Sequence, residues 1–223
     1  DVIAHLSSKP EIEWIRLHYA YPAGFPTEIL KVMRERDNIC KYLDMPLQHI
    51  SDNMLKAMRR GINKKKTIDL IQKIREEVPG IAIRTTLIAG YPGETEEDFQ
   101  ELLAFVKEAK FNRLGVFEYS HEENTHAYLV EDDVPAEVKE FRVATIMAAQ
   151  QEISFDLNSQ MMGKRVKVLV DRREGEYWIG RTEFDSPEVD NEVLITGDVP
   201  AVGEFCTVEI FDTAEFDLFG QVV

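Results

Sequence analysis

The chain has 223 residues, 44% of them hydrophobic and 30% charged, a composition typical of a globular protein with one or two domains. Acidic residues outnumber basic ones 41 to 26, and the formal charge of −15 argues against nucleic-acid binding as the main task. No run of about 18 apolar residues occurs, so no membrane span is predicted. The two cysteines, Cys40 and Cys206, exclude a disulfide scaffold or a Cys-rich metal site and favour a reducing, cytoplasmic setting.

Short apolar segments alternate with amphipathic, charged ones through the first part of the chain. Strands are predicted at residues 14–19, 39–44, 81–88 and 113–119. Helices are predicted between them at residues 64–78 and 95–110, where apolar residues recur every three or four positions. Strands that alternate with helices of this length indicate βα units and a parallel sheet.

The pattern changes after Pro135. A long helix is predicted over residues 136–160, and its buried side is expected to carry Val138, Phe141, Thr145, Ala148 and Ile153. Five short strands follow, at residues 166–170, 177–181, 192–195, 205–211 and 218–222. The sequence therefore predicts an α/β domain over residues 1–160 and a small five-stranded antiparallel β-barrel over residues 161–223.

A glycine-rich segment, residues 87–95, leads from a predicted strand into the helix that Thr95 caps. Gly90 and Gly93 permit sharp turns and a close approach of the backbone to a ligand. A phosphate-binding loop would need a lysine and an electropositive helix start, whereas this segment carries Glu94 and further acids. The segment is therefore either a ligand contact at a strand end or a capped structural turn.

Arg84 interrupts an otherwise apolar strand, so it must either pair with an acid of a neighbouring strand or face an anionic ligand group. The strand pattern alone favours the structural pair. Gln48 and His49 follow the second predicted strand, where polar groups of βα proteins hold ligands. A lone histidine in a loop is more often a surface residue, and His49 is interpreted in that way.

Several charged groups outside these segments carry weaker signals. Asp44, Glu118, Glu122 and Glu123 could supply carboxylates for acid–base chemistry, but their spacing does not show that any two of them meet. The short basic run at residues 64–66 is interpreted as the solvent side of a helix start.

In combination, these segments resemble the radical-SAM methylthiotransferase family, and most closely its branch that modifies a ribosomal protein. The segments that carry the resemblance are residues 16–22, 42–49, 55–60, 84–99, 118–120, 134–139, 180–181, 186–190 and 215–220, in this order. They cover nearly the whole chain, which makes the series more specific than any single motif. The resemblance implies a partial radical-SAM TIM-like βα barrel followed by a TRAM β-barrel.

The family resemblance also implies a reaction. It implies a cytoplasmic enzyme that replaces a C–H bond by a methylthio group, using S-adenosylmethionine and two 4Fe–4S clusters. In the branch that the chain resembles most closely, the substrate is the β-carbon of an aspartate in a small-subunit ribosomal protein. The cofactor performs the difficult step in such chemistry, and the protein orients it and excludes water.

The chain departs from the family in its cysteines. The family holds the radical-SAM cluster with a Cys-x3-Cys-x2-Cys motif and the second cluster with three further cysteines, and Cys40 and Cys206 match neither set. We therefore expect a carboxy-terminal portion that is inactive alone. Because the first strands of the sheet would be missing, its exposed edge is a candidate for dimerisation.

The resemblance and the strand-end positions together nominate the site residues. Those expected to face S-adenosylmethionine are Gln48, Arg84, Gly90, Pro92 and Tyr119. In this assignment Arg84 pairs with the methionyl carboxylate, Gln48 binds the ribose and Gly90 admits the adenosine. Those expected to line the substrate pocket are Arg16, Tyr19 and Tyr21. No residue of the chain is assigned as catalytic or metal-binding.

Two other functions stay open: a transfer-RNA methylthiotransferase with the same chemistry, and a non-catalytic domain that only binds a partner. The formal charge of the predicted barrel distinguishes a ribosomal-protein substrate from transfer RNA. Residues 164–223 contain six basic and fourteen acidic side chains, a formal charge of −8. Such a barrel suits a basic ribosomal protein and not an RNA backbone.

Overall fold

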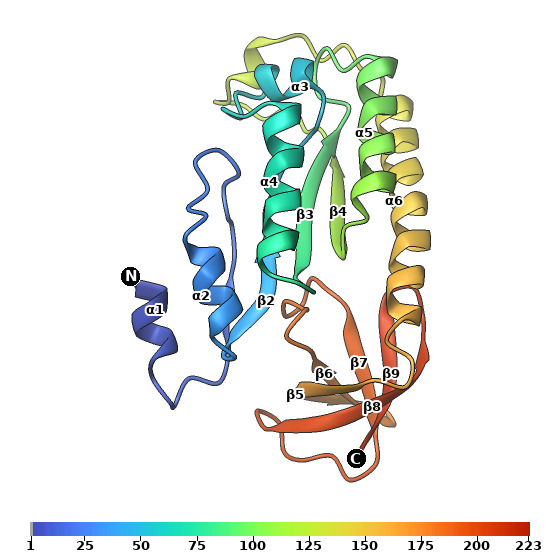
Figure 1. Ribbon diagram of the computed structural model, residues 1–223. Helices are drawn as coiled ribbons and strands as arrows, with labels where there is room; N and C mark the ends of the chain where they lie inside the picture. Colours follow the sequence, from blue (N-terminus) through green and yellow to red (C-terminus); the bar gives the residue numbers. More distant parts are fainter. Residues whose placement is uncertain (1) are drawn as a thin grey trace. The chain divides into compact units, whose positions relative to one another are not determined.

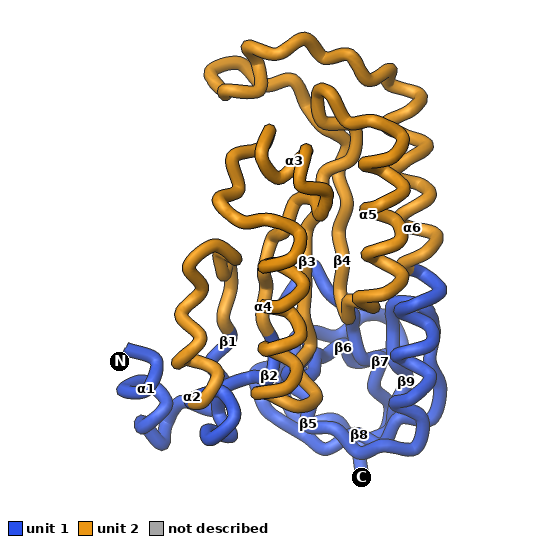
Figure 2. Tube along the Cα trace, turned by 45° about the horizontal axis from the view of Figure 1, so that its top comes forward, with its two compact units in different colours: residues 1–16, 32–42, 151–223 blue, residues 17–31, 43–150 orange. Residues whose placement is uncertain are grey.

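A computed structural model describes residues 2–223 of the chain (Figure 1). Two compact units are distinguished by their internal contacts: one comprises residues 1–16, 32–42 and 151–223, and the other residues 17–31 and 43–150 (Figure 2). We call them the barrel unit and the sheet unit. Both are interleaved along the chain, so the proposed division into domains near residue 160 stays a prediction.

The four predicted strands of the α/β part are present. They are β1 (Ile15–Leu17), β2 (Ile39–Asp44), β3 (Ala82–Ala89) and β4 (Arg113–Glu118). They form one sheet in the order β1-β2-β3-β4. β3 and β4 run parallel, in a register from Arg84 opposite Arg113 to Ala89 opposite Glu118. The carboxyl ends of these two strands therefore lie side by side, as expected for βα units.

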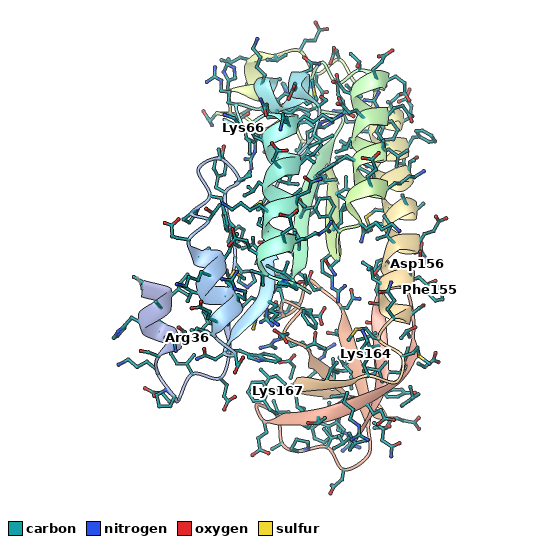
Figure 3. All side chains as sticks on the ribbon, in the orientation of Figure 1. Arg36, Lys66, Phe155, Asp156, Lys164 and Lys167 are labelled. Atoms are coloured by element: carbon teal, nitrogen blue, oxygen red, sulfur yellow. The ribbon has the colours of Figure 1, made fainter. Side chains whose placement is uncertain are left out.

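Both predicted helices of the sheet unit are also confirmed, and Figure 1 shows them alongside β3 and β4. They are α4 (Lys64–Glu77) and α5 (Glu96–Ala109). A capping box starts α5, because the Thr95 hydroxyl accepts from the Asp98 amide and the Asp98 carboxylate accepts from the Thr95 amide. Lys66, labelled in Figure 3, is exposed in the first turn of α4, as the basic run there suggested.

Four short helical segments were not predicted. They are α1 (Val2–Ser7), α2 (Ile29–Glu35), α3 (Asp52–Ala57) and the 3-10 turn η1 (Ala127–Leu129). The longest has seven residues, too few for a periodic apolar pattern to be distinguished from a loop.

The long helix α6 (Ala136–Ser159) is confirmed, but its predicted buried side was wrong in part. Ile153 is buried as expected, whereas Phe141 is 63% exposed. The buried side is rotated from the predicted one and includes the charged residues Lys139 and Arg142. The buried positions of the helix are Lys139, Arg142, Ile146, Ala149, Gln150, Ile153, Ser154 and Asn158.

The five remaining strands close into a barrel in the order β5-β6-β7-β9-β8. Their bounds are Arg165–Glu174, Tyr177–Arg181, Glu192–Thr196, Phe205–Thr213 and Asp217–Val222 for β5 to β9. One detail differs from the antiparallel barrel that was predicted: β7 and β9 pair in parallel. The strand β8 lies between β7 and β9 in the chain, but it pairs with β5 and β9 and not with β7. Because both of these pairings are antiparallel, β9 runs in the same direction as β5 and can lie parallel to β7. The core consists of Val168, Val170, Val193, Ile195, Val208, Ile210 and Leu218.

Among residues 2–223, no helix combines the length and the apolar character that crossing a membrane requires.

Candidate functional site

The candidate site lies at the carboxyl ends of the strands in the sheet unit. After β2 ends at Asp44, the chain continues beside β3: the Met45 amide donates to the Arg84 carbonyl and the Gln48 amide to the Thr86 carbonyl, each over 2.9 Å. Gln48 then forms an isolated parallel bridge with Leu87. Its backbone is left-handed, with φ of 71°. The half-buried Gln48 side chain is thereby carried to the end of β3.

Arg84, the third residue of β3, forms an ion pair with Asp44, the last residue of β2. Its Nη1 donates to Asp44 Oδ1 over 3.1 Å and to the Thr86 hydroxyl over 3.2 Å. The side chains are 17% and 5% exposed, so the pair is shielded but the guanidinium remains reachable from outside. Of the two partners left open by the sequence, the structure shows the acid of the neighbouring strand.

The segment after β1 reaches the same carboxylate. The Tyr19 amide donates to Asp44 Oδ2 over 3.4 Å, and the Tyr19 side chain is 83% exposed. The Tyr21 hydroxyl donates to the Arg60 carbonyl over 2.8 Å, while the Arg60 guanidinium lies 4.6 Å from the Tyr21 ring centre. Tyr19 is therefore joined to the Arg84–Asp44 pair, and Tyr21 to the loop that follows α3.

Arg16 has different surroundings from the two tyrosines with which it was grouped. It belongs to the barrel unit, where its Nη2 donates to the carbonyls of Thr182 and Glu183 over 3.1 and 3.3 Å. Its guanidinium also lies 5.4 Å from the ring centre of Tyr42. These contacts give Arg16 a structural task, and a substrate contact by Arg16 stays a prediction.

A buried ion pair holds the glycine-rich segment. Glu94 accepts from the Gly90 amide over 2.5 Å and from the Tyr91 amide over 3.2 Å. Its other oxygen, Oε1, lies 3.1 Å from Nη1 of Arg142, and the two side chains are 0% and 6% exposed. Burial raises the pKa of Glu94, although Arg142 and the two amides oppose this rise. The acid that argued against a phosphate loop thus shapes the turn, in which Pro92 is also buried.

Lys139 fills the space beside Gly90. A Cβ at Gly90 would collide with the aliphatic part of Lys139, and the Gly90 φ of 78° also favours glycine. The Lys139 ammonium pairs with Asp132 over 2.6 Å and lies 5.1 Å from the ring centre of Tyr119. The Tyr119 amide donates to the Ala89 carbonyl over 2.9 Å. The structure therefore brings Gly90 and Tyr119 together through a lysine that sequence reasoning missed.

Helical periodicity in the sequence could have predicted that Lys139 and Arg142 are buried. Counting back from Ile146 by four and seven positions gives Arg142 and Lys139, which lie on the same helix face. The sequence offered no direct sign that Glu94 and Asp132 would accept them.

His49 is buried, so the interpretation of this residue as a surface histidine was wrong. It is 0% exposed, and its Nδ1 accepts from the Ser51 amide over 3.1 Å. Burial lowers the pKa of His49 to about 4, and Arg142 lowers it further while Asp98 opposes the shift. The imidazole is thus neutral at pH 7 and supports the start of α3, which Ser51 caps.

This histidine predicts a loss of stability in acid. Because the folded-state pKa of about 4 lies below the ordinary 6.5, the unfolded chain binds more protons between these values, and stability falls as pH decreases through this range. At pH 5 the His49 contribution to the free energy of unfolding should be lower than at pH 7 by about 2 kcal/mol. Urea unfolding of the chain and of His49→Gln at both pH values measures it. An equal loss in the variant would contradict the assignment.

The described residues do not fit an iron–sulfur cluster. Between Val2 and Val223, no three His, Cys, Asp or Glu side chains are placed to hold a metal ion. Cys40 is 0% exposed, and burial raises the pKa of its thiol to about 11, which disfavours the thiolate that a cluster needs.

Comparisons with known proteins match this architecture. The family model for the radical SAM superfamily matches residues 2–106, and that for the TRAM domain matches residues 162–223. The chain therefore carries a radical SAM domain in its first half and a TRAM domain at its end. This agrees with the partial βα sheet and the closed barrel that the sequence predicted.

Its curated relatives bear the name "Ribosomal protein uS12 methylthiotransferase RimO". The relative from Cytophaga hutchinsonii is 60% identical over 225 residues, which cover 100% of this chain and 52% of the relative. The relative from Flavobacterium johnsoniae is 55% identical over 223 residues, covering 99% and 51%. The chain thus spans about half the length of the curated relatives that it matches.

A solved structure supports the fold independently. Coproporphyrinogen III oxidase (HemN) from Escherichia coli, a radical SAM enzyme, superposes with a TM-score of 0.51 at 16% identity, over 88% of this chain and 45% of that structure. At this identity the likeness concerns the radical SAM fold alone.

Proposed function

We propose that the chain is the carboxy-terminal half of a radical SAM methylthiotransferase that acts on ribosomal protein uS12, as its RimO relatives are named. The observation that carries this proposal is the Arg84–Asp44 ion pair where β2 ends, with Gln48 following beside β3, in the part of the chain that the radical SAM model matches. By the family resemblance, the modified group is the β-carbon of an aspartate.

The residues along β3 and after the strand ends are proposed to bind S-adenosylmethionine. Arg84 offers a guanidinium that Asp44 orients, which suits a carboxylate such as that of the methionyl group. Gln48 offers an amide at the end of β3 for the ribose, and Tyr119 offers a ring next to Gly90 for the adenine. Gly90 and Pro92 would contribute by shaping the turn that Glu94 holds, because both are buried and Lys139 fills the space beside Gly90. When bound, S-adenosylmethionine supplies the methyl group and the radical chemistry.

The chain's own residues would orient and shield the reacting groups. The ion pair between Glu94 and Arg142 holds the Gly90 turn, and the Lys139 side chain packs against Gly90. Tyr19 and Tyr21, which are 83% and 47% exposed, remain available to a protein substrate that approaches the Arg84–Asp44 pair. The two 4Fe–4S clusters that the family implies have no fitting ligands among the described residues, so we propose that the chain alone is inactive.

We further propose that the acidic TRAM barrel, residues 161–223, contacts the basic ribosomal protein. Its formal charge of −8 over residues 164–223 would repel an RNA backbone and attract a cationic partner. Such a partner implies a cytoplasmic location. The strand β1, which pairs only with β2 at one end of the sheet, is the edge proposed for dimerisation.

Transfer RNA is the competing substrate, and one experiment separates the two. The full-length protein that contains this chain is expressed in a bacterial strain that lacks both kinds of methylthiotransferase. We expect intact-mass spectrometry of uS12 to show the increment of one methylthio group, and nucleoside analysis of the transfer RNA to show none. Methylthio-adenosine in the RNA with unmodified uS12 would contradict the proposal.

A further inference from the structure

The last residue of β4 and the loop that follows it carry no basic lysine or arginine side chain. Residues 118–133 contain six carboxylates and no lysine or arginine. Three of the six are engaged in the structure: Asp132 pairs with Lys139, the Asp133 carboxylate accepts from the Gly93 amide over 2.7 Å, and the Glu122 carboxylate accepts from the Ser120 hydroxyl over 2.5 Å. Glu123 and Glu131 are exposed. The loop therefore presents a negative surface directly after the strand end that carries Tyr119.

Aromatic rings form a continuous series along this loop. The ring centres of Tyr91 and Tyr119 are 5.1 Å apart, those of Tyr119 and His121 6.0 Å, and those of His121 and Tyr128 4.6 Å. The last two rings are inclined by only 32°, so they present a broad face. Tyr128 is 42% exposed. An open pocket of about 640 Å³ lies at this end of the series; it is lined by Glu123, Asn124, Thr125, His126, Tyr128 and Leu129.

The same series already binds one cation of the chain itself. The Lys139 ammonium lies 5.1 Å from the Tyr119 ring centre and pairs with the Asp132 carboxylate over 2.6 Å. An aromatic ring combined with a carboxylate is a favourable site for a lysine or arginine side chain. The outer part of the series has the same components, because Tyr128 and Glu123 line one pocket. Arg59 reaches His126 on the wall of this pocket, with its Nη2 2.9 Å from His126 Nε2, and in the described part of the chain it is paired with neither Glu123 nor Tyr128.

We propose that residues 118–133 form a docking surface for a lysine- or arginine-rich protein segment, whose cationic side chain enters the pocket between Tyr128 and Glu123. A polyanion is disfavoured by the six carboxylates, so RNA is not the occupant. The inference rests on the proposed function in one respect: because Tyr119 belongs to both, the docked segment would lie next to the cofactor site of the sheet unit.

Binding of a basic peptide to the full chain tests the docking surface. The probe is a fluorescein-labelled peptide of alternating arginine and glycine, followed by fluorescence anisotropy at low ionic strength. The loss of two exposed charge pairs between peptide and protein corresponds to an affinity lower by a factor of about five. The double variant Glu123→Gln/Glu131→Gln should therefore weaken peptide binding about fivefold. The matched control, Glu76→Gln/Glu108→Gln, removes the same charge from exposed positions of α4 and α5 and should leave the affinity unchanged.

The aromatic component is tested with Tyr128→Leu, which keeps an apolar side chain but removes the ring. A cation over an exposed aromatic ring strengthens binding about threefold. Tyr128→Leu should therefore weaken peptide binding about threefold. Equal weakening by the loop and control charge variants, or unchanged binding by Tyr128→Leu, would overturn the proposal, because the peptide would then respond only to the overall negative charge.

A second readout separates this inference from the proposed function. The loop variants are built into the full-length protein and titrated with S-adenosylmethionine, whose affinity should stay at the wild-type value. Loss of peptide binding with intact cofactor binding supports the docking surface. Failure of even the wild-type protein to bind the cofactor would refute the proposed function, and the peptide titrations would still decide the docking surface.

Discussion

Replacement of Arg142 by methionine is expected to lower the free energy of unfolding by about 3–5 kcal/mol, because it leaves the Glu94 carboxylate buried without its partner. Glu94 is 0% exposed and is tied to the Gly90 and Tyr91 amides, so it cannot turn toward water without breaking the glycine turn. Urea unfolding followed by circular dichroism measures the loss.

The control is an ion pair of the same chemistry on the surface. Arg165 and Glu209 of the barrel are 68% and 43% exposed and 2.9 Å apart. Since exposed pairs contribute little, Arg165→Met should cost less than about 1 kcal/mol. A similar small loss for Arg142→Met would show that Glu94 does not depend on its buried partner.

Replacement of Gly180 by alanine is expected to destabilise the barrel by about 3 kcal/mol or more. A Cβ at this position of β6 would lie 2.5 Å from Val168 Cγ1 and 2.6 Å from the carbonyl oxygen of Leu169. The second contact is with the backbone of the paired strand β5, so the overlap is relieved only if the ladder itself moves. Thermal or urea unfolding monitored by tryptophan fluorescence measures the effect, since Trp178 packs against the barrel core.

Gly115→Ala provides the matched control on another strand. A Cβ at Gly115 of β4 meets its nearest atoms at 3.8 and 3.9 Å, which is ordinary contact. We expect a change within about 1 kcal/mol. If Gly180→Ala were equally mild, the close packing of β5 on β6 would be wrong.

The elements whose sequence pattern is local were the ones predicted well. The strands β3 and β4 and the helices α4 and α5 appear within a residue or two of their predicted bounds, because periodicity and capping are written into adjacent residues. The short helices α2 and α3 have no such pattern and were missed. The parallel pairing of β7 with β9 depends on how the chain crosses the barrel, which strand patterns do not encode.

The candidate site shows the same division. Strand-end positions correctly placed Gln48 and Tyr119 at the carboxyl edge, because the ends of parallel strands meet there. The partners of its charged groups were not found. Arg142 pairs with Glu94 across 48 residues, and an acid on one element carries no local sign of a base on another. His49 was misjudged for this reason, since its burial depends on tertiary packing.

The central proposal is that the sheet unit binds S-adenosylmethionine through Arg84, and calorimetric titration of the full-length protein tests it most directly. Arg84→Ala should raise the dissociation constant about tenfold. Arg84→Lys should recover part of the affinity, because a lysine keeps the charge but not the fork of donors. Lys66→Ala, which removes an exposed cation of α4, should leave the constant unchanged. Wild-type affinity in Arg84→Ala would contradict the proposal.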